Sequence, residues 1–150
     1  MSGNGQRVAF ITTFDPTGGN PAHLQQLFAN DADGANLIQL TSGGDIWAPS
    51  VSDDGQRIVY GHQSEIRAIL ADGTGDRALS AAGVSTFFPT ISGDGSTVIY
   101  LGELPGCAET QVGAVDWEGT DAIRLSCLQI GGATYGSVLF ADLTDDGQTV

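Results

Sequence analysis

The sequence predicts an all-β protein built from a short repeated unit. Glycine is very frequent, at 22 of 150 residues, and the glycines lie between short apolar runs, as in a chain with many tight turns. Hydrophobic residues make up 41% of the chain, which is the composition of a folded domain rather than a disordered one. An Asp-Gly or Asn-Gly turn followed by a run of β-branched and aromatic residues recurs along the chain, which is typical of β-hairpins.

The repeated unit carries three anchors that keep the same order. The first is the Asp-Gly or Asn-Gly turn leading into a strand, found as NGQRVAF, DGQRIVY, DGSTVIY and DGQTV from Asn4, Asp54, Asp94 and Asp146. The second is another glycine turn, found as DADGANLIQLT, LADGTGDRALS and DWEGTDAIRLS from Asp31, Leu70 and Asp116. The third precedes the first, and is found as APSVS, FPTIS and FADLT from Ala48, Phe88 and Phe140.

Each unit is expected to form four strands, A to D, joined by short Asp/Gly turns between A and B and between C and D. Strand A is expected at 48–52, 88–92 and 137–144, and strand B at 6–13, 56–61 and 96–102. Strand C is expected at 23–29, 65–71 and 110–117, and strand D at 37–41, 77–80 and 122–126.

A repeat of about 40 residues with four short strands is the period of a β-propeller blade. One blade cannot bury both faces of its own sheet, so blades stack face to face. The predicted fold is a β-propeller segment of about three four-stranded antiparallel blades in an incomplete ring. It is expected to form one unit over 1–150, with repeats at about 2–52, 53–92 and 93–144 and the start of a further repeat at 145–150.

The charge of the chain excludes several kinds of partner. There are 18 acidic and five basic residues, all of the latter arginine, and the net charge is −13. Such a surface repels phosphate backbones and anionic lipids, so nucleic-acid binding and attachment to anionic membranes are not expected. The sequence has no apolar window of 18 residues, so membrane insertion is not expected. The N-terminus lacks the pattern of a signal peptide.

The pattern xPxxSxDGxxIxY, followed by a strand and then DGxxxxxLT, resembles the TolB-type WD-like β-propeller repeat, a bacterial envelope and secreted propeller family. The resemblance covers essentially the whole chain. It implies a periplasmic or secreted location and a fold that hosts unrelated activities. The family's usual Ser-Pro-Asp-Gly turn is Ser-Asp-Asp-Gly at 52–55 and Ser-Gly-Asp-Gly at 92–95. These changes alter the rigidity of the turn rather than the topology.

Three repeats are fewer than the four to eight blades that close a propeller. The chain begins just before a strand B and ends within another, at DDGQTV. Two arrangements stay open: a fragment of a longer parent chain that holds the remaining blades, or a homodimer of two three-repeat chains that completes a six-bladed ring.

The acidic turns do not match a calcium loop, which needs alternating ligands and a Glu six residues beyond the glycine. Beyond Asp53-Asp54-Gly55 that position is Gly61, and beyond the turn ending at Gly34 it is Leu40. These turns are therefore interpreted as hairpins. No metal site and no cofactor is expected.

Cys107 lies just before a strand C and Cys127 ends the following strand D. A hairpin that turns near 118–119 would bring the two together, so a disulfide and two separate thiols both stay open. The resemblance favours the disulfide because it points to an oxidising compartment. A zinc site is not expected, because two cysteines at this spacing match no ligand pattern.

No catalytic constellation is expected in this chain. The sequence lacks G-x-S-x-G, and a Ser-His-Asp set would have to use His23 or His62, both predicted at the edges of loops. Paired carboxylates are too common in an acidic chain to mark an acid/base couple.

The longer connections are expected on one face of the segment, because the B–C and D–A loops share a face. The insertions are Phe14 to Ala22, Glu103 to Glu109 and Gln129 to Gly136, and length variation on one face marks the functional face of repeat proteins. Seven residues there are candidates for contact with a partner: Asp15, His23, Trp47, His62, Glu65, Glu103 and Tyr135.

The sequence therefore favours a non-enzymatic binding scaffold of the TolB-like type, which presents one loop face to a protein or glycan. The alternative is an accessory propeller domain of a prolyl-oligopeptidase-like hydrolase whose catalytic domain is absent from this chain.

Overall fold

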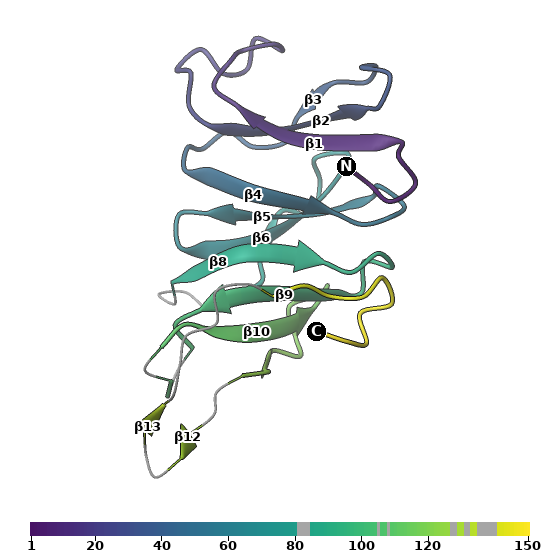
Figure 1. The fold of residues 1–150 in the computed structure, drawn as a ribbon. Helices are drawn as coiled ribbons and strands as arrows, with labels where there is room; N and C mark the ends of the chain where they lie inside the picture. The colour runs from purple at the N-terminus through teal and green to yellow at the C-terminus, as the bar shows by residue number, and fades with distance from the viewer. Residues whose placement is uncertain (81–84, 105, 108, 127–128, 131–132, 135–140) are drawn as a thin grey trace.

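Three antiparallel sheets stack on one another in the computed structural model of the chain (Figure 1). The structure describes residues 1–150 apart from 81–84, 105, 108, 127–128, 131–132 and 135–140. The described residues form strands and turns and no α-helix, and so contain no helix that could span a bilayer.

Each sheet is a meander in which strands that follow one another in sequence also pair. The first contains β1 (Arg7–Thr12), β2 (Gln26–Asp31) and β3 (Ile38–Gln39). The second contains β4 (Ile46–Val51), β5 (Arg57–His62), β6 (Glu65–Leu70) and β7 (Arg77–Ala78). The third contains β8 (Thr86–Ile91), β9 (Thr97–Gly102), β10 (Gln111–Asp116) and β11 (Ile123–Arg124). A two-stranded ribbon of β12 (Gln129–Ile130) and β13 (Ala133–Thr134) follows.

The predicted fold class is confirmed: the second and third sheets are blades with strands A to D, and the first has strands B to D. Several predicted strand limits differ. The first strand C begins at Gln26 rather than His23, because the chain at His23 is still in the B–C loop, with a φ of 52° in the left-handed region. The outer D strands pair over only two residues each, as expected where twist carries the outermost strand away from its neighbour. The third predicted strand A lies partly outside the described residues, and 141–144 do not form a strand.

Both A strands carry the same bulge. The register between β4 and β5 shifts between Trp47 and Ser50, and the register between β8 and β9 shifts at the equivalent place. At the bulge, Ala48 and Phe88 have φ values of 44° and 51°, and each precedes a proline. Proline has no N–H to offer a ladder, so a bulge is where a strand tolerates it. The bulge turns the loop-side half of each A strand relative to its turn-side half.

The core lies between the sheets rather than within any one of them. Because side chains alternate along a strand, Ile58 packs toward the first sheet while its neighbour Val59 packs toward the third. The outer side of the third sheet is covered by Ala141 and Leu143, which pack on a third apolar cluster. Full burial of each such side chain contributes about 1.5–3 kcal/mol, so stacking stabilises every blade through its neighbours.

A hydroxyl closes each turn between strands A and B. Ser52 Oγ donates to Asp54 Oδ1 at 2.6 Å and accepts the Arg57 amide at 3.1 Å. The Gly55 amide then donates to the Ser52 carbonyl at 3.0 Å. The same three bonds recur in the turns that start at Ser2, Ser92 and Thr144. Four copies of Ser/Thr-x-Asp/Asn-Gly therefore form one repeated structure.

Backbone hydrogen bonds join these turns from blade to blade. The Asn4 amide donates to the Asp53 carbonyl at 3.0 Å, the Asp53 amide to the Gly93 carbonyl at 2.8 Å, and the Asp94 amide to the Asp145 carbonyl at 2.8 Å. Gly55 must be glycine here, because its φ is 74° and a β-carbon would come within 2.8 Å of the Arg7 side chain in the preceding turn. The four turns thus form a continuous ladder along one edge of the stack.

A tryptophan with two arginines strengthens the contact between the second and third sheets. Arg57 and Arg77 place their guanidinium carbons 5.1 and 4.6 Å from the centroid of the Trp117 ring. Arg57 also donates to the Gly95 carbonyl at 2.8 Å, and Arg77 donates to the Trp117 carbonyl. Cation–π contacts of this kind contribute about 0.5–2 kcal/mol each.

Substitution of Ser52 by alanine should destabilise the chain. Ser52 is fully buried, and Ser52→Ala removes the hydroxyl contacts with Asp54 and Arg57 and leaves the Arg57 amide without its partner. We expect the free energy of unfolding, measured by urea titration, to fall by about 1–3 kcal/mol. The control Ser42→Ala removes an exposed hydroxyl and should change it by less than about 0.5 kcal/mol. Equal losses in both variants would contradict the role given to the Ser52 hydroxyl.

Candidate functional site

The two ends of the stack differ in character. The A–B and C–D turns lie at the end toward which β4 and β8 point in Figure 1, and the B–C and D–A loops lie at the opposite end. We call these ends the turn face and the loop face.

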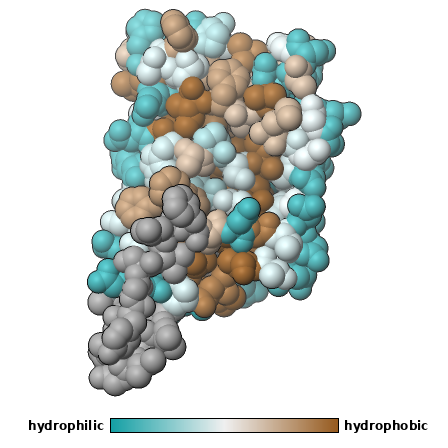
Figure 2. Space-filling view, viewed as in Figure 1, coloured by the Kyte–Doolittle hydropathy of each residue, from teal (hydrophilic) through white to brown (hydrophobic). Residues whose placement is uncertain are grey.

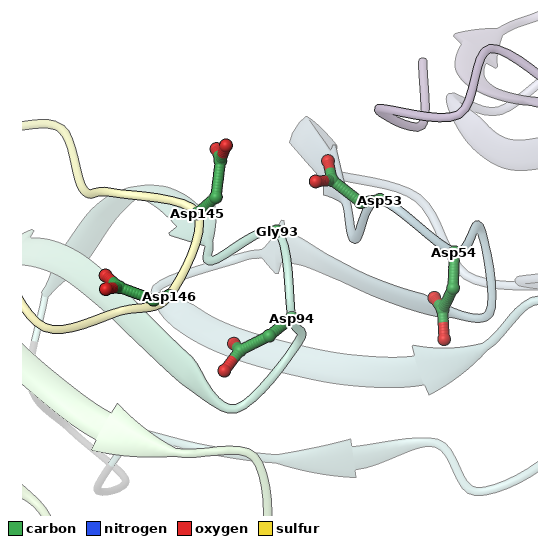
Figure 3. Close-up of a pocket in the computed structure, with 6 residues that line it drawn as sticks. All are labelled: Asp53, Asp54, Gly93, Asp94, Asp145 and Asp146. Atoms are coloured by element: carbon green, nitrogen blue, oxygen red, sulfur yellow. The ribbon is translucent and has the colours of Figure 1, made fainter.

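The acidic turns form a shallow depression on the turn face (Figure 3). It is lined by Asp53, Asp54, Gly93, Asp94, Asp145 and Asp146. The Ser52 hydroxyl and the Gln56 amide donate to Asp54 and lower the pKa of that carboxyl below its ordinary value. The pKa values of Asp94 and Asp146 are lowered for the same reasons, first by the hydroxyl of their own turn and then by the amide two residues on.

Three of these five aspartates bond within the turns that contain them. The carboxylates of Asp54, Asp94 and Asp146 accept bonds within their own turns, while Figure 3 shows those of Asp53 and Asp145 pointing away from the carboxylates of Asp54 and Asp94. In the part of the chain that the structure describes, no three His, Cys, Asp or Glu residues are grouped so that they could hold a metal ion. Asp54, Asp94 and Asp146 are thus engaged in hairpin structure.

On the loop face, a buried asparagine organises the first B–C loop. The Asn20 side chain donates to the carbonyls of Leu24 at 2.9 Å, Phe14 at 3.2 Å and Thr13 at 3.4 Å. Its carbonyl oxygen accepts the Leu24 amide at 3.1 Å. Asn20 is 3% exposed, whereas Phe14 and Leu24 are 77% and 44% exposed. The loop is therefore internally bonded and presents apolar side chains to solvent.

An aromatic patch lies at the loop-side ends of β4 and β8, and consists of Trp47, Phe87 and Phe88. The Trp47 ring centroid is 6.2 Å from that of Phe87 and 6.5 Å from that of Phe88, with interplanar angles of 35° and 71°. Phe87 is 40% and Phe88 62% exposed, and Trp47 is half-buried. Figure 2 shows a band of apolar residues on the side of the molecule that displays β1, β4 and β8.

Local packing fixes the central ring of the aromatic patch. The Trp47 ring lies over Gly61, where any side-chain carbon would overlap it. Its indole N–H donates to the Gln63 carbonyl at 3.2 Å. The patch is therefore built on two bulged strands with a held tryptophan rather than on a free loop, which suits a preorganised contact surface.

The structure gives the predicted site residues different surroundings. Asp15 accepts the Asn20 amide at 2.8 Å, and His23 Nδ1 lies 3.0 Å from the Thr13 carbonyl, so both hold the first B–C loop. Glu65 forms an ion pair of 3.3 Å with Arg67. Trp47 belongs to the aromatic patch.

His62 and Glu103 lie at the loop-side ends of β5 and β9, and Tyr135 lies outside the described residues. Neither the histidines nor the carboxylates form a catalytic constellation in the described part of the chain. As a set of contact residues, the seven candidates stay a prediction.

Two residues of the aromatic patch escaped the sequence analysis. The sequence predicted Phe88 only as the first residue of a strand A and gave Phe87 no role. An alignment of Trp47-Ala48-Pro49 with Phe87-Phe88-Pro89 could have revealed them. It places Phe87 at the position equivalent to Trp47, which was a predicted contact residue. Phe88 is exposed because of the bulge, which no sequence pattern predicted.

The disulfide between Cys107 and Cys127 stays a prediction, because Cys127 lies outside the described residues. Cys107 is partly buried and packs against the core between the second and third sheets.

Solved structures establish the fold of the chain, whereas no family model and no curated protein sequence matches it. It is similar to a protein described as TolB from Agrobacterium tumefaciens, with a TM-score of 0.62, 18% identity, and coverage of 82% of this chain and 46% of that one. It is also similar to TolB from Acinetobacter baumannii, with a TM-score of 0.56, 18% identity, and coverage of 79% of this chain and 30% of that one. The β-propeller domain of the Trilobed protease from Pyrococcus furiosus matches with a TM-score of 0.54, 15% identity, and coverage of 81% of this chain and 40% of that one.

The chain thus has the TolB-type propeller fold that its repeats predict, and it spans less than half the length of each of these structures. At such low identity the likeness carries the fold alone, and function must be argued from the surface of this chain.

Replacement of Asn20 by alanine should loosen the first B–C loop alone. Asn20→Ala removes the side-chain partner of the Phe14 and Leu24 carbonyls and of the Leu24 amide, while the Thr13 carbonyl keeps its contact with His23 Nδ1. We expect hydrogen exchange at the Leu24 amide, followed by NMR, to accelerate by about tenfold or more. The Ile66 amide, which donates to Ser80 Oγ in the second sheet, should be unchanged. Equal acceleration at both amides would show that Asn20 stabilises the whole stack instead.

Proposed function

We propose that this chain is a non-enzymatic binding scaffold that presents its loop face to a protein or glycan partner. The observation that carries the proposal is the aromatic patch of Trp47, Phe87 and Phe88, which stays exposed on the loop face. Exposed aromatic residues gathered in one place mark contact sites, because large rigid rings bury much area at little cost in side-chain entropy.

The division between the two faces supports this assignment. On the turn face, backbone and carboxylate groups are engaged in the ladder and in the hairpins. On the loop face, the connections vary in length, and Phe87 and Phe88 lie exposed. A structural face with regular short turns and a variable face with apolar contacts is the usual arrangement in repeat proteins. A periplasmic or secreted location is part of the proposal and rests on the likeness to TolB.

The second candidate is an accessory propeller domain of a hydrolase of the prolyl-oligopeptidase type. It is favoured by the likeness to a propeller domain of a protease. The partner of the loop face would then be a catalytic domain. The completion of the ring, by further blades of a parent chain or by a second copy in a six-bladed homodimer, also stays a prediction.

Site-specific photocrosslinking tests which face meets the partner. A benzoylphenylalanine placed at Phe88 should form covalent adducts on irradiation in an envelope extract, because the aromatic patch would be covered by the partner. The same group at Asp121, an exposed residue of a C–D turn, should form few. Adducts at Asp121 that match or exceed those at Phe88, or none at Phe88, would refute the assignment of the loop face.

A further inference from the structure

We infer that the aromatic patch binds a basic peptide segment, in which an arginine or lysine lies next to a large apolar side chain. This inference rests on the proposed function and names the chemistry of its partner. Three observations carry it: how the arginines of the chain are used, which carboxylates lie at the loop-side ends of the strands that carry the aromatic patch, and how the chain already pairs arginine with tryptophan.

Each of the five arginines is engaged within the chain. Arg7 pairs with Asp31 at 3.2 Å, and Arg67 with Asp76 at 3.0 Å. Arg57 and Arg77 hold Trp117, and Arg124 also has an intramolecular contact. With 18 acidic residues against these five, most carboxylates have no cation to pair with. The field outside the protein is negative, so it attracts a basic partner and repels an acidic one.

Two residues with exposed carboxylates lie at the loop-side ends of the strands that carry the aromatic patch. Asp45 stands two residues before Trp47, and its carbonyl accepts the Gln63 amide at 3.1 Å. The Glu103 amide donates to the carbonyl of Ser85, two residues before Phe87, at 3.0 Å. Both acidic side chains are exposed, and in the described part of the chain neither forms an ion pair. An anion thus stands at the loop-side end of each bulged strand.

The rings of the aromatic patch suit a guanidinium or ammonium group as well as an apolar one. A cation placed within about 6 Å of a ring centroid is attracted by the negative face of the ring. Trp117 shows this contact inside the same chain, with two arginines at 5.1 and 4.6 Å. Trp47 is the other tryptophan of the sequence, and it has no cation over its ring in the described structure.

A peptide is favoured over a glycan by the polar groups around the aromatic patch. Sites that orient a sugar need several polar groups converging on its hydroxyls. The indole N–H of Trp47 is already bonded to the Gln63 carbonyl, and the two phenylalanines offer no polar atom. The charged residues at the loop-side ends of these strands are Asp45 and Glu103, and the net charge of the chain is −13, so a cationic partner is favoured.

Calorimetric titration of the whole chain with a defined peptide tests this inference. The probe is acetyl-Gly-Arg-Phe-Arg-Gly-amide, compared with the same peptide carrying Glu in place of Arg and with maltohexaose as an uncharged glycan. We expect the Arg peptide to bind with a Kd below about 1 mM and the other two not to bind in that range. Raising NaCl from about 50 to about 300 mM should weaken binding by about threefold or more.

Variants locate the site. Phe88→Ala should weaken binding of the Arg peptide by about tenfold, and the backbone tolerates it because Ala48 has the same conformation at the equivalent bulge. The matched control Phe14→Ala removes an exposed ring outside the aromatic patch and should leave the Kd within about twofold. Asp45→Asn combined with Glu103→Gln should weaken binding by about threefold or more, whereas Asp33→Asn combined with Asp121→Asn should not.

The inference is overturned if the Arg peptide fails to bind below about 1 mM, if the Glu peptide binds as well, or if maltohexaose binds instead. Equal weakening by Phe14→Ala and Phe88→Ala would also overturn it. A failure here together with crosslinking at Phe88 would leave the binding scaffold standing with a different partner chemistry. Failure of crosslinking at Phe88 would remove the proposed function itself.

Discussion

A hydroxyl at the start of each Ser/Thr-x-Asp/Asn-Gly turn is the constraint on which the rest of this structure depends. The side chains of Ser2, Ser52 and Ser92 close their turns by bonding an Asp or Asn two residues on and an amide five residues on. The closed turns then bond one another, which fixes how each sheet sits on the next. The core lies between the sheets. The distance that the bonded turns set between neighbouring sheets therefore decides whether the apolar side chains of β5 and β9 pack against the adjacent sheet.

This constraint also divides the chain into a structural and a variable face. On the turn face, backbone groups bond in the ladder, and hydrogen bonds within the turns lower the pKa values of Asp54, Asp94 and Asp146. The loop face carries no such ladder, so its loops can differ. The first is ordered by Asn20, and the A strands that start there bring three aromatic rings together through a shared bulge. A regular frame therefore supports an irregular contact surface.

The blades could be predicted from the sequence because glycine turns separate the strands and the same order of turns and apolar runs recurs along the chain. It was less informative about side chains whose environment depends on three dimensions. The bulge exposes Phe88, which the sequence predicted only as the first residue of a strand A. Asp15 and Glu65 looked available for contact, but they bond the Asn20 amide and Arg67. The bonds between turns join residues 40 to 51 positions apart, such as Asp53 and Gly93, and no local pattern specifies them.

The central claim is that the ladder of turns fixes the stack. Native-state hydrogen exchange at the Asp53 and Asp94 amides tests it most directly, because both donate across a blade boundary. If the ladder holds the stack, these amides should exchange as slowly as amides inside β5 and far more slowly than the exposed Gly43 amide of the loop face. Exchange at the rate of Gly43 would contradict the claim, since the turns would then open independently of the sheets.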